Sequence, residues 1–112
     1  MTDSVLLAQI LDSLIEPVLV GDTDHKVVYM NRAAAGHYTG GRKLMGTSLL
    51  DCHNDASQRI MIEVLEAMRA GEDERLISAN DKRRIYMRAI RDESGALVGY
   101  YERYERPSKH PE

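Results

Sequence analysis

The 112-residue sequence contains no tryptophan, no phenylalanine and only one cysteine, Cys52. A single cysteine cannot form an internal disulfide, which fits a reducing compartment such as the cytoplasm. Without Phe and Trp, the core has to be built from aliphatic side chains together with the six Met and six Tyr residues. Methionine packs adaptably around irregular shapes, so this composition fits a malleable pocket as well as an ordinary core.

Long apolar runs and long blocks of one charge sign are also missing. No stretch approaches the roughly 20 apolar residues that span a bilayer, and the first residues do not have the pattern of a secretory signal peptide. The net charge of −3 is spread along the chain, which disfavours binding to a nucleic-acid backbone. We therefore expect one cytoplasmic domain that associates neither with membranes nor with nucleic acid.

The first segment, residues 3–15, has the spacing of an amphipathic helix that Pro17 ends. Either its whole apolar face packs on its own domain, or part of it pairs with the same helix of a second chain. The second interpretation predicts a dimerisation helix over residues 1–16, a domain over 17–106 and a disordered tail over 107–112. It assigns five side chains to the dimer interface: Leu6, Leu7, Ile10, Leu11 and Leu14.

A β-hairpin and a short helix are predicted next. Residues 17–21 and 26–30 are rich in β-branched side chains, and the turn residues 22–25 separate them. Asn31 is placed to cap a short helix over residues 32–35.

The middle of the chain changes from irregular to strongly periodic. Residues 40–54 are expected to form short helical turns, and residues 55–70 a long amphipathic helix. Asp55 and Gln58 have the spacing of a capping-box variant at its start.

Three strands are predicted after this helix, over residues 74–79, 84–90 and 97–104. In the last of them the alternation places Val98, Tyr100 and Tyr104 on one face and Leu97 and Tyr101 on the other. The order of elements predicts an α+β fold with a five-stranded antiparallel sheet, helices on one face and an additional N-terminal helix.

These segments resemble a PAS domain, and the resemblance covers residues 5–106. It is carried by residues 15–22, 27–34, 44–46 and 86–99. It implies a sensory or interaction module of a signalling system, without catalytic activity, that dimerises and acts on a downstream signalling protein. Members of this family hold haem, flavin or a small metabolite between the central helices and the sheet, and many hold nothing known.

The stretch over residues 49–55 carries the cysteine and a histidine, and we expect it to form one wall of a ligand pocket. The predicted wall consists of His37, Leu49, Cys52, His53, Ile60, Met61, Val64 and Met87. The residues do not identify the ligand.

His53 has three interpretations. It forms a local hydrogen bond at the start of the long helix, it serves as the axial ligand of a haem in a redox or gas sensor, or it has another metal or redox role. His37 is a weaker candidate for the haem ligand.

Other cofactor chemistry is disfavoured. The cysteine of flavin photosensors in this family falls three residues after a glycine that matches Gly46, and here that position is Leu49. Cys52 and His53 are adjacent and have no partners at the spacing of a zinc site. The spacing of Gly41 and Gly46 begins like a phosphate loop but lacks its lysine. Cys52 is then interpreted as a small buried apolar side chain.

Overall fold

The computed structural model describes residues 3–106, so the predicted tail over 107–112 lies outside the described residues. The side chain of Cys52 is also outside the description. The elements are, in chain order, α1 (Asp3–Asp12), β1 (Val18–Asp22), β2 (Val27–Met30), α2 (Arg32–His37), the 3-10 helices η1 (Gly41–Leu44) and η2 (Leu49–Cys52), α3 (Asp55–Arg69), β3 (Glu74–Ala79), β4 (Arg84–Arg91) and β5 (Leu97–Glu105). No helix within residues 3–106 is both long enough and apolar enough to cross a membrane.

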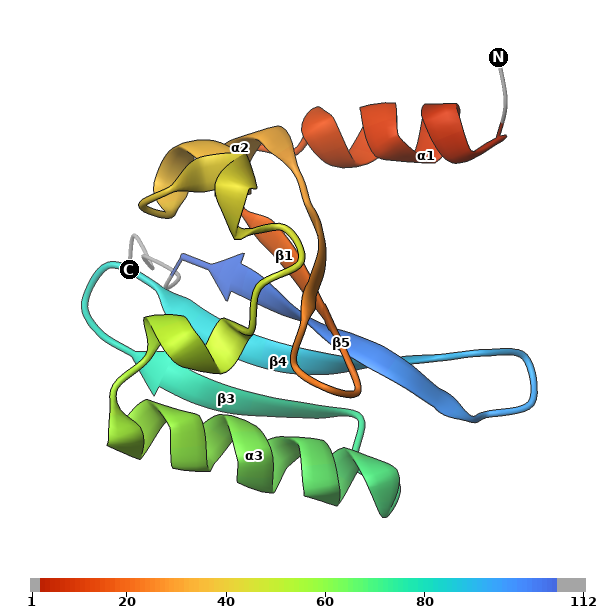
Figure 1. The fold of residues 1–112 in the computed structure, drawn as a ribbon, viewed down its shortest axis with the longest axis vertical. Coiled ribbons are helices and arrows are strands. Elements are labelled where there is room, and N and C mark those ends of the chain that lie inside the picture. Colours follow the sequence, from red (N-terminus) through yellow and green to blue (C-terminus); the bar gives the residue numbers. More distant parts are fainter. Residues whose placement is uncertain (1–2, 107–112) are drawn as a thin grey trace, which may run out of the picture.

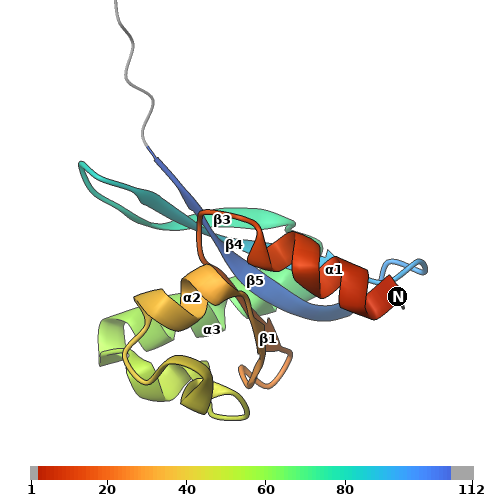
Figure 2. The ribbon, with the colours of Figure 1, turned by 90° about the horizontal axis from the view of Figure 1, so that it is seen from above.

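The five strands form one sheet in the order β2-β1-β5-β4-β3, and all neighbouring strands are antiparallel. This confirms the predicted fold class. β5 lies at the centre and joins the N-terminal hairpin to the C-terminal strands. Figure 1 shows α3 along the sheet, and Figure 2 shows that α2 and α3 lie on the same side of it.

Alternation along β5 determines which side chains face the helices. Tyr100, Glu102 and Tyr104 are buried, whereas Tyr101 and Arg103 between them are partly exposed. The buried core on the helical side contains the aliphatic, Met and Tyr side chains that the composition required: Leu19, Val27, Met30, Ala34, Leu49, Met61, Val64, Leu65, Met68, Met87 and Tyr100.

The start of α3 differs from the predicted capping box. Asn54, not Asp55, is the N-cap, and its side chain accepts a hydrogen bond from the backbone N–H of Ser57. The Gln58 amide instead turns back and donates to the carbonyls of Leu50 and His53, at 2.8 and 2.9 Å. These bonds fix the junction between η2 and α3.

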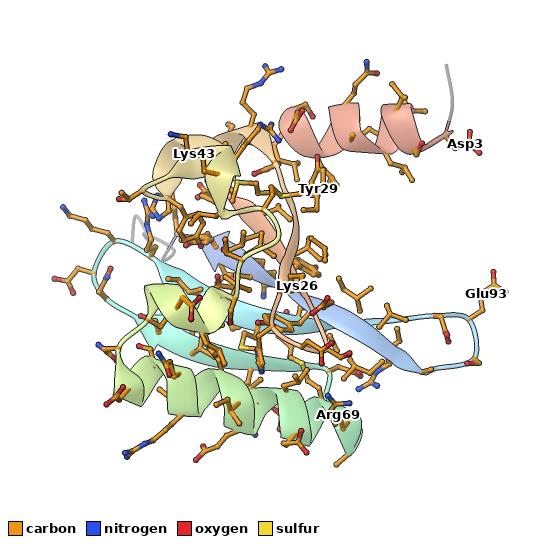
Figure 3. The ribbon with its side chains drawn as sticks, in the orientation of Figure 1. Asp3, Lys26, Tyr29, Lys43, Arg69 and Glu93 are labelled. Carbon is orange, nitrogen blue, oxygen red and sulfur yellow. The ribbon has the colours of Figure 1, made fainter. Side chains whose placement is uncertain are left out.

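The N-terminal helix ends at Asp12, three residues before the predicted end. At this end, the Ser13 hydroxyl donates to the Ile10 carbonyl at 2.6 Å, and the Leu11 carbonyl accepts from Asn31. None of the residues of α1 is buried. The helix stands beside α2 in Figure 1, and Figure 3 shows Tyr29 of β2 lying near it, where its hydroxyl donates to the Ala8 carbonyl at 3.5 Å.

Asn31 connects this N-terminal segment to the rest of the domain. Its side-chain oxygen accepts from the backbone N–H groups of Val18 and Ala34, each at 2.9 Å. Its amide nitrogen donates to the carbonyls of Leu11, at 2.8 Å, and Glu16, at 3.2 Å. One fully buried side chain thus holds the end of α1, the linker, β1 and the first turn of α2.

Candidate functional site

A hollow of about 160 Å³ lies between α3 and the sheet. Cavities of about this size hold a single benzene ring in other proteins. The lining residues come from the η2–α3 junction, α3 and strands β3, β4 and β5: His53, Ser57, Ile60, Met61, Ile77, Ser78, Ile85 and Glu102. The lining is apolar apart from two hydroxyls, one imidazole and one carboxyl group.

Glu102 is an unusual residue for the central strand of a sheet, because its side chain is only 3% exposed. Its cross-strand neighbours, Leu19 on β1 and Met87 on β4, are buried apolar residues. Burial raises the pKa of Glu102, while nearby His53 and a hydrogen bond from Tyr38 act in the opposite direction. The sheet therefore holds an ionisable group in an environment that penalises its charge.

Tyr38, the C-cap residue of α2, supplies the hydrogen bond to this carboxyl group. Its hydroxyl donates to Glu102 Oε2 at 3.3 Å and also contacts the Tyr104 hydroxyl. Burial raises the pKa of Tyr38 above its ordinary value and that of Tyr104 to about 12, so both hydroxyls keep their protons at neutral pH. In the contact between Tyr38 and Tyr104 either hydroxyl can be the donor.

The His53 ring borders the hollow and is held by a backbone contact. Its Nδ1 lies 2.6 Å from the Leu49 carbonyl oxygen. A carbonyl oxygen only accepts, so Nδ1 carries the hydrogen, and Nε2 is the acceptor when the ring is neutral. His53 thus forms a local hydrogen bond at the start of α3 and also borders the candidate site.

The predicted wall residues fall into four groups. His53, Ile60 and Met61 border the hollow. The side chains of three others lie in the packed core: Leu49, Val64 and Met87. His37 lines a separate depression and contacts the rings of Tyr38 and Tyr104 edge-on. Cys52 cannot be placed, because its side chain is outside the description.

Sequence reasoning missed Ser57, Ile77, Ser78, Ile85 and Glu102. A signal for Glu102 was present, because the predicted alternation placed Tyr100 and Tyr104 on the same face of the last strand. The residue midway between them has to share that face.

The hollow does not fit the large cofactors of the resemblance. Haem and flavin are much larger than one benzene ring, and the buried carboxyl group would lie against either of them. Within the part of the chain that the structure describes, no group of three or more His, Cys, Asp or Glu side chains could hold a metal ion. The site as arranged is suited to a small organic molecule.

Solved structures with a similar fold include a sensor histidine kinase, a PAS domain and a protein bound to DPO. The sensory box sensor histidine kinase from Vibrio cholerae is 14% identical, with 95% of this chain and 93% of that chain covered and a TM-score of 0.67. The PAS domain of BvgS from Bordetella pertussis is 16% identical, with 96% and 89% covered and a TM-score of 0.66. VqmA bound to DPO is 10% identical, with 93% and 57% covered and a TM-score of 0.60.

A family model described as the PAS fold matches residues 11–108, so the chain belongs to the PAS family, which confirms the resemblance. PAS domains are sensory modules of signalling proteins, sensor histidine kinases among them. A comparison with curated proteins finds no match.

Proposed function

We propose that this domain senses a small molecule that binds in the hollow between α3 and the sheet, and that it passes the signal to a downstream signalling protein. The observation that carries the proposal is the buried Glu102 carboxyl group at the hollow, held by Tyr38 from the helical side. Buried ionisable groups in a cavity are typical of functional sites. VqmA, a protein with a similar fold, is bound to DPO.

Filling the hollow tests this function. Ser57 lines it from the first turn of α3, so Ser57→Leu adds an apolar side chain at the site without removing the Asn54 cap. The exposed Arg59, on the same helix, provides the matched control Arg59→Leu.

Native mass spectrometry of the purified domain is expected to detect a small molecule bound to the wild type and to Arg59→Leu, but not to Ser57→Leu. Equal occupancy of all three proteins would contradict binding in the hollow. An absorption spectrum with added haem tests the haem alternative at the same time, and we expect no Soret band that depends on His53.

We also propose that the domain forms a homodimer through α1. Its apolar side chains Leu6, Leu7 and Ile10 are 46%, 60% and 49% exposed, and Leu14 in the following linker is 45% exposed. A groove of about 680 Å³ continues from this linker onto the outer face of β5, and its lining includes Leu14, Ile15, Val18 and Tyr101. A second copy of α1, which is equally apolar, suits this surface.

The expected dimer is weak. Burying the exposed half of a Leu or Ile contributes about 1 kcal/mol, so four side chains from each copy contribute about 8 kcal/mol. Association itself costs at least about 4 kcal/mol. The difference corresponds to a Kd of about 1 mM from these residues alone, and to tighter binding where the groove is also covered.

Sedimentation velocity from 10 µM to about 1 mM protein tests the dimer. Leu7→Lys is expected to shift the protein toward monomer, and Gln9→Lys, an exposed polar position on the same helix, to leave the distribution unchanged. A wild-type protein that stays monomeric over the whole range would refute the dimer.

A further inference from the structure

The polar groups at the hollow leave one oxygen atom without a donor. Glu102 Oε2 accepts from Tyr38, but among residues 3–106 no described group donates a hydrogen bond to Oε1. The carboxyl group lines the hollow and is otherwise enclosed, at 3% exposure. Among the described residues no fully enclosed side-chain nitrogen or oxygen lacks a hydrogen-bond partner, so Oε1 is accessible, and only a donor inside the hollow can satisfy it. The hollow is the route by which a donor can arrive.

The other polar residues of the lining, His53, Ser57 and Ser78, make no hydrogen bond to Glu102 in the structure. His53 uses its Nδ1 hydrogen on the Leu49 carbonyl, which leaves Nε2 as an acceptor in the neutral ring. With His53 neutral, the site therefore presents two acceptors, Glu102 Oε1 and His53 Nε2, beside the Ser57 and Ser78 hydroxyls, which can donate or accept. Four aliphatic or thioether side chains complete the wall and suit the faces of a flat ring: Ile60, Met61, Ile77 and Ile85.

We propose that the hollow binds a single-ring ligand whose N–H group donates a hydrogen bond to the Glu102 carboxylate. This inference rests on the proposed function and specifies its ligand class. An anionic ring would meet the carboxylate with like charge, and a purely apolar ring would leave Oε1 without a donor. A nitrogen heterocycle or aromatic amine of about benzene size satisfies both the volume and the polarity of the site.

Burial by itself disfavours the ionised form of Glu102 that this assignment uses. Burial raises the pKa of Glu102, and the hydrogen bond from Tyr38 only partly offsets that effect. An N–H donor from the ligand favours the ionised carboxylate in the same way as Tyr38 does, and charge-assisted hydrogen bonds of this kind are among the stronger ones. The ligand would thus supply the hydrogen-bond donor that Glu102 Oε1 does not have within the described residues.

Three probes of similar size separate the ligand classes: 2-aminopyridine as the donor ring, benzoate as the anionic ring and toluene as the apolar ring. Each is titrated into the ¹⁵N-labelled chain, and amide shifts are followed at Ser57, Ile77 and Ser78. 2-Aminopyridine is expected to bind at least about 10-fold more tightly than benzoate or toluene.

Two variants at Glu102 and one matched control complete the experiment. Glu102→Gln removes the charge and Glu102→Leu removes the acceptor; we expect about 10-fold weaker binding of 2-aminopyridine to the first and about 30-fold weaker binding to the second. Glu105→Gln makes the same chemical change three residues along β5, where the carboxyl group is in ion pairs with Arg84 and Arg103, and is expected to bind like the wild type.

The outcomes distinguish this inference from the proposed function. Binding of benzoate or toluene as tight as that of 2-aminopyridine, or unchanged binding in both Glu102 variants, overturns the ligand class while the hollow remains a binding site. If no probe shifts the amides of the hollow in the wild type, the ligand class is overturned and the proposed function loses its support as well.

Discussion

Replacing Asn31 by alanine is expected to lower the free energy of unfolding by about 3 kcal/mol. The side chain caps α2, and loss of an Asn cap costs about 1 kcal/mol. It makes three further hydrogen bonds, to the N–H of Val18 and to the carbonyls of Leu11 and Glu16. Each contributes about 0.5 to 1.5 kcal/mol net. Because the site is fully buried, water cannot readily replace the lost amide.

Urea unfolding followed by circular dichroism measures this change, with the midpoint expected to fall while the slope stays constant. In thermal unfolding the same loss corresponds to a decrease of about 10–15 °C in Tm. Asn54→Ala is the matched control, because Asn54 caps α3 with one exposed side-chain hydrogen bond, and should cost about 1 kcal/mol. A loss in Asn31→Ala no larger than that in the control would refute the reasoning.

Asn31→Asp separates the hydrogen bonds that the side chain accepts from those that it donates. A carboxylate still accepts from the N–H groups of Val18 and Ala34, but it cannot donate to Leu11 and Glu16 and repels their carbonyl oxygens. We expect faster amide exchange at the end of α1, with α2 remaining protected. Equal deprotection of both helices would contradict this division.

Three further predictions concern the sheet. Gly99→Ala is expected to destabilise the domain by about 3 kcal/mol in urea unfolding, because a Cβ at this position would collide with the carbonyl oxygen of Gly21 on β1. Glu102→Gln should gain stability relative to the wild type as the pH rises from about 4.5 to 8, because a raised pKa in the folded state stabilises the protein only while the carboxyl group is protonated. Arg103→Met should cost about 1 kcal/mol at pH 7, because Arg103 forms two hydrogen bonds to the Glu74 carboxylate. That cost should disappear as the pH falls below 4.5, because the pKa of Glu74 is lowered in the folded state by this pairing.

Each of these has an outcome that would contradict it. Unchanged stability of the Gly99 variant would mean that the close approach of β1 and β5 relaxes at little cost. Parallel pH profiles for wild type and Glu102→Gln, or a pH-independent cost for Arg103→Met, would exclude the assigned carboxyl groups as the cause.

The fold could be predicted from the sequence because its signals are local and agree with one another. The alternation in β4 and β5, the turn at residues 92–95 and the apolar lines of α3 each specify one element, and their order leaves few topologies. The predicted end of α1 was wrong by three residues and the predicted cap of α3 by one. Asn31, 20 residues away in the sequence, bonds the last turn of α1, and the Gln58 side chain bonds the preceding η2 turn in place of the helix start.

The candidate site was less predictable. A pocket wall is a set of side chains from several elements, and the pattern of one element cannot distinguish Leu49 or Met87, which pack in the core, from Ile60, which borders the hollow. Glu102 was missed because a charged residue in a strand is normally assigned to the solvent face. Here the alternation and the residue type conflicted, and such conflicts are typical of functional positions.

The six residues of α2 span about 9 Å, and the buried Asn31 and the half-buried Tyr38 lie at its two ends. Asn31 holds one end to α1, and Tyr38 holds the other to the carboxyl group at the hollow. A helix of six residues is short enough to move as a single rigid body. A shift of the Glu102 carboxyl group would therefore tilt α2 through Tyr38. That tilt would move the end of α1, which is bonded to Asn31.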